Sequence, residues 1–346
     1  MSVDAVILVS FGGPEGMEDV MPFLENVLHG KNVPEDRKLQ VAEHYKLFGG
    51  ISPINQQNRA LVDALKDELE AHNIRLPIYF GNRNWHPLLP ETLKQMRDDG
   101  VKHALALVTS AYSSYSGCKQ YLDNIQRAVD TVGGTVSIQK LRQYYNHPGF
   151  IEANIDRVKD AIGKLPNRSS AFAIAFTAHS IPIAMANTSP YEEQLREVAG
   201  VIADRLKVAD WALVFQSRSG PPGQPWLEPD ILDHIRAIKA DGCAQLVVAP
   251  IGFISDHLEV VYDLDHQAKE LCDEVGITMR RAGTAGLHSA AVSMFRELIE
   301  EQIRPGTARR VYGSGTAWPD ACPPDCCDYS ASPPPRSGEG CAGNNG

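Results

Sequence analysis

The sequence predicts an α/β protein of two doubly wound, Rossmann-like domains, each with a four-stranded parallel sheet flanked by helices. Short apolar runs rich in β-branched residues alternate with amphipathic helical patterns, as they do in βαβ units. The runs form two groups of four, and the groups separate near residue 165. Ionisable residues directly follow two runs of the second group, and open α/β sheets bind their ligands at that end of the strands.

The first predicted domain spans residues 1–165. A helical stripe of Leu61, Leu65 and Leu69 lies between its first two strands and suits a packing face. The glycine-rich turn after the first strand suits close approach of a planar ligand to the backbone, or an ordinary strand-to-helix turn. The expected strands are Ala5–Ser10, Pro77–Phe80, His103–Thr109 and Thr135–Gln139.

The second predicted domain spans residues 166–310, and a tail of residues 311–346 follows it. The tail is rich in Gly, Pro, Ser and Cys and has few large apolar residues. Such a segment cannot bury enough surface to fold unaided, so it is either disordered or tied down by a metal. The expected strands of this domain are Phe172–Thr177, Trp211–Gln216, Gln245–Ile251 and Ile277–Arg280.

Composition and charge exclude several classes of protein. The formal net charge is −10, which leaves no broad basic face for a nucleic-acid partner. No apolar run reaches the 18 residues of a membrane span. The N-terminal apolar run has no basic segment before it, so we interpret it as a strand and not as a signal peptide. The expected location is the cytoplasm.

Residues 245–267 place an acidic cluster directly after a buried-strand pattern. If the segment is helical, Asp256, Glu259 and Asp263 share one face and raise one another's pKa by charge repulsion. A bound cation, or a proton in transit, would relieve that repulsion. The alternative is a solvated helix start, where acidic residues are common.

A second strand pattern, ending in the sequence TAHSIP, places His179 at the same sheet edge as the acidic cluster if the sheet is parallel. Histidine is the side chain whose ordinary pKa lies closest to neutrality, and it is also a common metal ligand. The juxtaposition predicts an acid/base pair or a metal site. The alternative is a strand-end histidine that only forms a local hydrogen bond.

These residues belong to several long motifs that resemble the ferrochelatase family. The resemblance runs from about residue 4 to about residue 300, with the motifs in the family's order. The cysteine-bearing tail resembles the iron–sulfur ferrochelatases of actinobacterial type. The motifs are LVSFGGPEG, GGISPINQQ, YFGNRNWHP, TAHSIP, QSRSGPPGQPWLEPD and GFISDHLEVVYDLD.

The resemblance implies a chelatase-like fold and insertion of Fe²⁺ into coproporphyrin III, giving Fe-coproporphyrin III in haem biosynthesis. It also implies that helix Ser289–Ile303 packs back on the first domain and that other haem-pathway enzymes are transient partners. Three alternatives stay open: protoporphyrin IX as the substrate, a different inserted metal, and a non-catalytic tetrapyrrole or metal carrier.

The resemblance also implies roles for single residues. His179 takes the base role, and Glu259 binds the metal with it or relays protons. Asp256 and His257 belong to the same motif, while Asp263 and Asp265 form an acidic path or a solvated face. Phe11 stands where many bacterial members carry tyrosine, so an iron ligand from that side is not expected. The positions that contact substrate are Phe11, Tyr45, Ser52 and Tyr121.

Cysteine usage is uneven, and the seven cysteines are a poor fit to a disulfide framework. The resemblance places Cys118 at the family's internal cluster-ligand position and adds Cys322, Cys326 and Cys327 from the tail, with Cys341 as an alternative ligand. Four thiolates suit a [2Fe–2S] cluster or a tetrahedral zinc ion. The alternative is a redox-labile tail without a metal.

Overall fold

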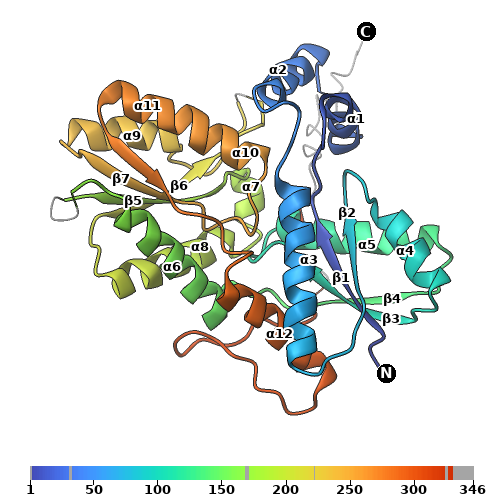
Figure 1. The fold of residues 1–346 in the computed structure, drawn as a ribbon. Coiled ribbons are helices and arrows are strands. Elements are labelled where there is room, and N and C mark those ends of the chain that lie inside the picture. The colour runs from blue at the N-terminus through green and yellow to red at the C-terminus, as the bar shows by residue number, and fades with distance from the viewer. Residues whose placement is uncertain (1, 31–32, 168–170, 222, 324–325, 330–346) are drawn as a thin grey trace, which may run out of the picture.

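Two four-stranded parallel sheets organise the computed structural model, which describes residues 2–30, 33–167, 171–221, 223–323 and 326–329 (Figure 1). Their strand orders are β2-β1-β3-β4 and β6-β5-β7-β8, and every neighbouring pair is parallel. The predicted fold class is therefore confirmed. The strands are β1 (Ala5–Ser10), β2 (Ile78–Asn82), β3 (His103–Val108), β4 (Ser137–Lys140), β5 (Ala173–His179), β6 (Trp211–Gln216), β7 (Gln245–Ala249) and β8 (Thr278–Arg281).

Helices cover both faces of each sheet, as a doubly wound fold requires. None of the described helices is long and apolar enough to cross a membrane. The helices are α1 (Met17–Leu28), α2 (Glu35–Lys46), α3 (Ile54–Ala71), α4 (Leu89–Asp98), η1 (Tyr115–Lys119), α5 (Gln120–Thr131), α6 (Pro148–Gly163), α7 (Ile183–Ala186), α8 (Tyr191–Leu206), α9 (Ile231–Ala240), α10 (Leu258–Val260), η2 (Val261–Ala268), α11 (Lys269–Val275) and α12 (Ser289–Ile303).

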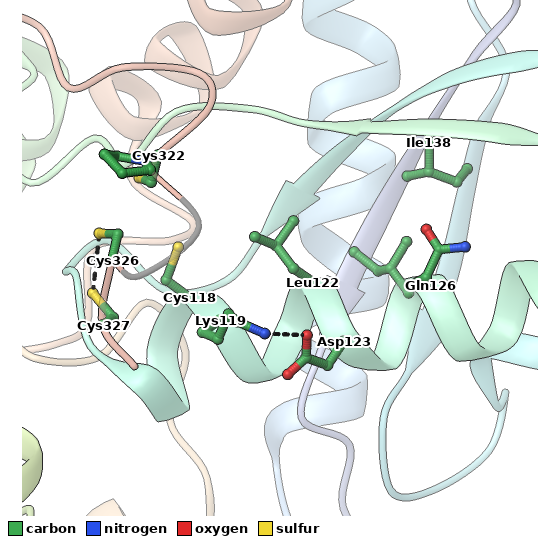
Figure 2. A pocket seen from close by; sticks show the side chains of 11 residues that line it. Cys118, Lys119, Leu122, Asp123, Gln126, Ile138, Cys322, Cys326 and Cys327 are labelled. Carbon is green, nitrogen blue, oxygen red and sulfur yellow. Dashed lines mark hydrogen bonds and ion pairs between the residues drawn. The ribbon is translucent and has the colours of Figure 1, made fainter. Parts of the chain in front are cut away.

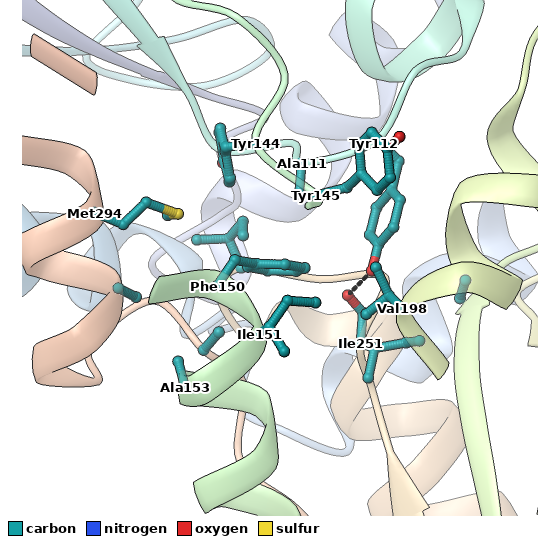
Figure 3. Close-up of a cluster of buried hydrophobic side chains, with 14 of the residues drawn as sticks. Ala111, Tyr112, Tyr144, Tyr145, Phe150, Ile151, Ala153, Val198, Ile251 and Met294 are labelled. Carbon is teal, nitrogen blue, oxygen red and sulfur yellow. Dashed lines mark hydrogen bonds between the residues drawn. The ribbon is translucent and has the colours of Figure 1, made fainter. Parts of the chain in front are cut away.

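The core is continuous from one sheet to the other. The predicted stripe of α3 is buried, and it joins residues of both sheets in one apolar cluster. Figure 3 shows aromatic rings of the first half, among them Tyr112 and Tyr144, packed around Phe150 of α6. The Tyr112 hydroxyl donates a hydrogen bond to the Ile251 carbonyl oxygen at 3.1 Å. The two halves therefore share a buried interface that holds the ends of β3 and β7 together.

Helices α6 and α12 bridge the two halves. α6 lies on the first-domain side of the predicted boundary at residue 165, yet it packs against α8, β7 and β8. α12 packs on α3 and on α6, so it contacts the first half as the resemblance implied. The exact boundary stays a prediction, because helices on each side of it pack across it.

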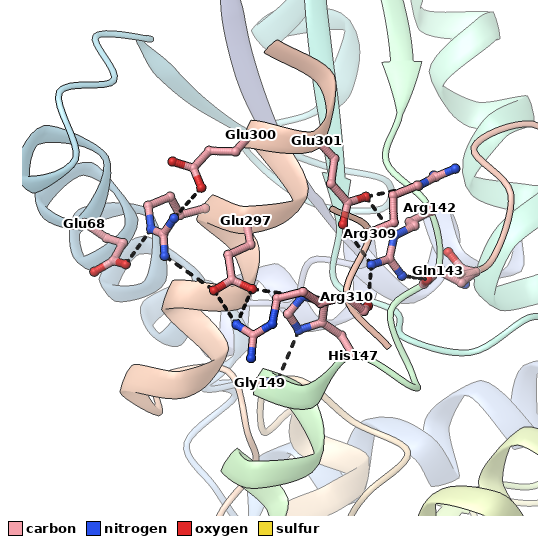
Figure 4. A network of polar contacts seen from close by, with 11 residues as sticks. Glu68, Arg142, Gln143, His147, Gly149, Glu297, Glu300, Glu301, Arg309 and Arg310 are labelled. Carbon is pink, nitrogen blue, oxygen red and sulfur yellow. Dashed lines mark hydrogen bonds and ion pairs between the residues drawn. The ribbon is translucent and has the colours of Figure 1, made fainter. Parts of the chain in front are cut away.

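A buried ionic network attaches α12 to its neighbours (Figure 4). Arg142 forms two hydrogen bonds of 2.9 Å with the Glu301 carboxylate, and both side chains are almost fully buried. Arg296 binds Glu68 of α3 at 2.9 Å. Bidentate pairs of this kind fix orientation as well as distance. The network therefore sets how α12 lies across the two halves.

The described part of the tail runs across the first half. The Tyr312 amide donates to the Asn146 carbonyl oxygen at 2.7 Å, and Asn146 donates to the Thr316 carbonyl oxygen at 3.1 Å. Further along, the Tyr329 ring lies 5.8 Å from the ring of Tyr115 in η1. These contacts bring the tail cysteines to the start of α5. Cys341 lies outside the described residues.

Candidate active site and thiol cluster

The carboxyl edge of the second sheet gathers polar side chains from adjacent strands. β5 ends at His179 and β6 ends at Gln216, and these two residues are register partners. β7 leads into a turn at Gly252, whose backbone passes so close to Ala178 that an added Cβ would lie 2.6 Å from the Ala178 Cβ. A side chain at this position would push the acidic segment away from β5. Glycine is therefore needed to bring the segment beside His179.

His179 and Glu259 face one another at this edge. The His179 Nε2 atom lies 3.5 Å from Glu259 Oε2, and His257 Nδ1 lies 3.9 Å from the same oxygen. His179 Nδ1 contacts the Ser180 carbonyl oxygen, which can only accept a hydrogen bond. Nδ1 therefore carries the proton in the neutral ring, and Nε2 presents its lone pair toward Glu259. The Glu259 side chain is 53% exposed, so it can reach an external ligand.

A π-helical segment shapes the acidic cluster. Residues Val261–Ala268 form η2, whose turns are wider than those of an α-helix, and such segments often occur at functional sites. Gln216 Nε2 donates to the Glu259 carbonyl oxygen at 3.4 Å and to Asp263 Oδ2 at 3.3 Å. The Ser217 hydroxyl also donates to Asp263. Gln216 and Ser217 were not predicted as site residues, although their place at the end of a strand could have indicated a role at this site.

The Asp263 carboxyl group is perturbed by its surroundings. Burial, and then the negative charge of Glu259, raise the pKa of Asp263 from 3.8 to about 6, against the opposing hydrogen bonds from Ser217 and Gln216. A carboxyl group with this pKa exchanges protons close to neutral pH. Asp263 is therefore suited to accept a proton from the adjacent histidine and glutamate.

Asp263→Asn is expected to raise the free energy of unfolding at about pH 8 by ~1–2 kcal/mol. Between pH 3.8 and about pH 6 the folded protein binds more protons than the unfolded chain, because folding raises the pKa of Asp263. Stability is therefore lost as pH rises through that window, and asparagine avoids the loss. Urea unfolding of both proteins at about pH 8 and about pH 4.5 measures the difference. An equal effect of the substitution at both pH values would contradict the raised pKa.

Two other acidic residues lie differently from the prediction. Asp256 precedes the helix that begins at Leu258, so it does not continue the face shared by Glu259 and Asp263. Arg281 lies 3.0 Å from Asp256 Oδ1 and 2.6 Å from Asp265 Oδ1. Ion pairing to this guanidinium neutralises both carboxylates. The stripe of three carboxylates was expected only if the segment were helical, and that condition fails at Asp256.

The first half contributes mainly aromatic residues near this edge. The Phe11 side chain is partly exposed, and its ring packs edge-on against Phe23 of α1. The Arg83 guanidinium lies 4.4 Å from the centre of the Tyr121 ring and 5.6 Å from that of Phe11. The remaining predicted substrate positions, Tyr45, Ser52 and Tyr121, are buried.

Helix α2 reaches across to the acidic segment. The His44 ring stacks on Tyr262 of η2, with 3.9 Å between ring centres and an angle of 12° between planes. Burial, and then the Glu259 charge, raise the pKa of Tyr45 well above its ordinary range, so this hydroxyl stays protonated. The first half therefore supplies a neutral hydroxyl and stacked rings close to Glu259.

Four cysteines line one pocket of about 310 Å³ between η1, α5 and the tail (Figure 2). Cys118 comes from η1, and Cys322, Cys326 and Cys327 come from the tail. The Cys326 and Cys327 sulfur atoms are 3.6 Å apart. Burial raises the pKa of the Cys118 and Cys327 thiols; Cys322 adds to the rise at Cys118, and the other three thiols of the pocket add to the rise at Cys327. A bound metal reverses this effect, because it stabilises the thiolate.

The pocket brings together four thiols, which is the ligand number of a [2Fe–2S] cluster. Among the described residues, no three His, Cys, Asp or Glu side chains are close enough to surround a single metal ion. A binuclear cluster spreads its four thiolate ligands over two irons, so it spans a wider pocket than one ion does. Lys140 lowers the pKa of Cys118, which favours the thiolate that such a cluster needs.

Solved structures place this fold among the chelatases. SirB from Bacillus subtilis with Fe³⁺ aligns at a TM-score of 0.55 and 11% identity, covering 90% of this chain and all of that one. CbiX, described as the terminal enzyme of siroheme biosynthesis in denitrifying bacteria, aligns at a TM-score of 0.52 and 14% identity, covering 86% of this chain and 98% of that one. The fold is therefore that of the two-domain α/β chelatases.

Sequence comparison identifies the family. The ferrochelatase family model matches residues 3–303, and the chain belongs to the ferrochelatase family. A ferrochelatase of Rhodopirellula baltica is 53% identical, with 97% of this chain and 96% of the relative covered. The coproporphyrin III ferrochelatases of Streptomyces coelicolor and Mycobacteroides abscessus are 45% and 46% identical, with at least 94% of each chain covered. The chain is thus a porphyrin metal chelatase of haem biosynthesis, with ferrous iron as its substrate metal.

Proposed function

We propose that this chain inserts Fe²⁺ into coproporphyrin III and releases Fe-coproporphyrin III. The observation that carries the proposal is the 3.5 Å separation of His179 Nε2 from Glu259 Oε2. Two ligand atoms at this separation fit one divalent ion with bonds of about 2.1 Å. The names of the relatives from Streptomyces coelicolor and Mycobacteroides abscessus support the choice of porphyrin.

The reaction releases two protons from the porphyrin nitrogens as the ferrous ion enters the ring. In our proposal, His179 Nε2 and Glu259 hold the ion until it passes to the ring nitrogens, and the Nε2 lone pair that this transfer frees then accepts a pyrrole proton. Asp263 accepts a proton in turn, because its pKa of about 6 leaves it largely ionised at neutral pH and still basic enough to act. Iron stays ferrous throughout, so the step needs no electron acceptor.

The propionates of the porphyrin need donors, since the chain as a whole is acidic. We propose that Tyr45, Ser52 and Tyr121 bind them as hydroxyl donors, and that Phe11 packs against the ring. The partly exposed Phe11, with the cation of Arg83 beside it, supports the ring contact, and the three hydroxyl positions rest on the family motifs that contain or adjoin them. Phe11 supplies no ligand atom, so the proposal assigns no iron contact to that side.

We further propose that Cys118, Cys322, Cys326 and Cys327 hold a [2Fe–2S] cluster, supported by their shared pocket. The cluster would supply thiolate–iron bonding that orders the tail against the first half. Its role is structural or sensory, because iron insertion transfers no electron. We also propose a cytoplasmic location, supported by the described cysteines, none of which forms a disulfide with another, as is usual in that compartment.

Coproporphyrin III is expected to give at least a tenfold higher kcat/KM than protoporphyrin IX, or about 1.4 kcal/mol of transition-state binding. Its two additional propionates form hydrogen bonds that protoporphyrin cannot replace. Anaerobic assays with the same Fe²⁺ supply and each porphyrin measure the ratio. A preference for protoporphyrin IX would overturn the substrate assignment and leave the family membership intact.

A further inference from the structure

The loop that carries Glu259 toward His179 is held by the other half of the molecule. Two consecutive residues of α3, Gln57 and Asn58, bind two consecutive residues of this loop. The Ser255 hydroxyl donates to Asn58 Oδ1 at 2.9 Å. The Asp256 amide donates to Gln57 Oε1 at 2.8 Å, and Gln57 Nε2 donates back to Asp256 Oδ2 at 3.3 Å. The contact between Gln57 and Asp256 is therefore reciprocal.

Asp256 has its whole carboxylate committed to such contacts. Arg281 donates to Asp256 Oδ1 at 3.0 Å and to Oδ2 at 3.3 Å, in addition to the bond from Gln57. The Asp256 side chain is only 15% exposed. A carboxylate with both oxygens occupied is poorly placed to bind iron, and well placed to join three elements. Asp256, three positions before Glu259, thus connects the loop to α3 and β8.

The same turn of α3 also holds the first sheet. Asn58 Nδ2 donates to the Ser10 hydroxyl at 2.8 Å, and both side chains are fully buried. Ser10 is the last residue of β1 and precedes Phe11. One turn of α3 therefore ties the carboxyl edge of the first sheet to the loop at the carboxyl edge of the second.

We propose that Gln57 is a positioning residue for iron insertion. His179 is fixed by its strand, whereas Glu259 follows a loop whose position depends on the reciprocal Gln57–Asp256 contact. Loss of that contact displaces Glu259 relative to His179, and small displacements of reacting groups are costly in rate. The inference rests on the proposed role of the His179–Glu259 pair in metal binding.

Gln57→Glu tests the proposal, because it keeps the acceptor for the Asp256 amide and replaces the donor with a second negative charge. We expect kcat/KM for Fe²⁺ to fall at least about tenfold, with KM for the porphyrin unchanged. The matched control is Gln56→Glu, the same change at the neighbouring, exposed position of α3. The activity of Q57E relative to Q56E should rise as pH falls, because protonation of the introduced carboxyl restores a donor.

A charge swap makes the test specific to the pair. In Q57E/D256N the introduced amide can donate to the introduced carboxylate, so the double variant should regain at least about threefold over Q57E. A loss that the swap does not reverse, or equal turnover of Q57E and Q56E, would overturn the proposal. If Q57E does not fold, Gln57→Ala replaces it, with an expected loss of about fivefold relative to Gln56→Ala. His179→Ala in the same assay distinguishes failure of the Gln57 proposal from failure of the proposed His179–Glu259 site. Full activity of that variant would contradict the site itself.

Discussion

His179→Ala is expected to lower kcat for iron insertion by about 10²–10⁴-fold while porphyrin affinity stays within a few-fold of wild type. The substitution removes the lone pair that Nε2 presents toward Glu259 at 3.5 Å. The porphyrin is bound mainly by its ring and propionates, so its affinity should not depend on this atom. Turnover by absorbance and affinity by fluorescence quenching measure the two quantities separately.

His72→Ala is the matched control for this variant, since His72 is an exposed histidine at the far end of α3. Its turnover should equal that of wild type. If His179→Ala also retained wild-type turnover, the histidine would have no part in the mechanism. If it lost porphyrin affinity in proportion to turnover, the residue would serve binding and not the chemical step.

Cys118→Ser is expected to abolish the visible absorption of the [2Fe–2S] cluster as completely as Cys322→Ser does, because such a cluster needs all four thiolates. The two cysteines lie far apart in the sequence but line one pocket. Iron and sulfide content, together with electron paramagnetic resonance of the reduced protein, measure cluster occupancy.

Cys243→Ser is the control, because Cys243 lies at the start of β7 and outside the pocket. Full cluster content in Cys118→Ser would show that Cys341 or another residue completes the ligand set. Zinc in place of iron and sulfide would redirect the assignment to a structural zinc site. Either result would leave the proposed insertion site unaffected.

The sheets and their active edge were predictable because each central strand is a short buried run in a parallel sheet, and such runs stand out from amphipathic helices. His179 at the end of β5 followed from the same pattern, and so did the acidic segment after β7. The structure placed both at one edge, as predicted, because the two strands are neighbours in the second sheet.

Long-range partners could not be predicted in this way. Arg281 pairs with Asp256 across 25 positions in the sequence, and no local pattern marks that pairing. Gln57 and Asp256 are 199 positions apart, so their contact follows only from how α3 packs between the sheets. The packing of α6 against the second sheet could not be predicted either, because an amphipathic pattern shows that a helix face is buried but not which element covers it.

Anaerobic incubation of the purified protein with Fe²⁺ and excess coproporphyrin III tests the central claim most directly. We expect the absorption spectrum of the metal-free porphyrin to be replaced, over many turnovers, by that of the iron porphyrin, and His179→Ala to lack this activity. Porphyrin that binds the protein but gains iron no faster than it does in protein-free buffer would contradict the account and indicate a carrier.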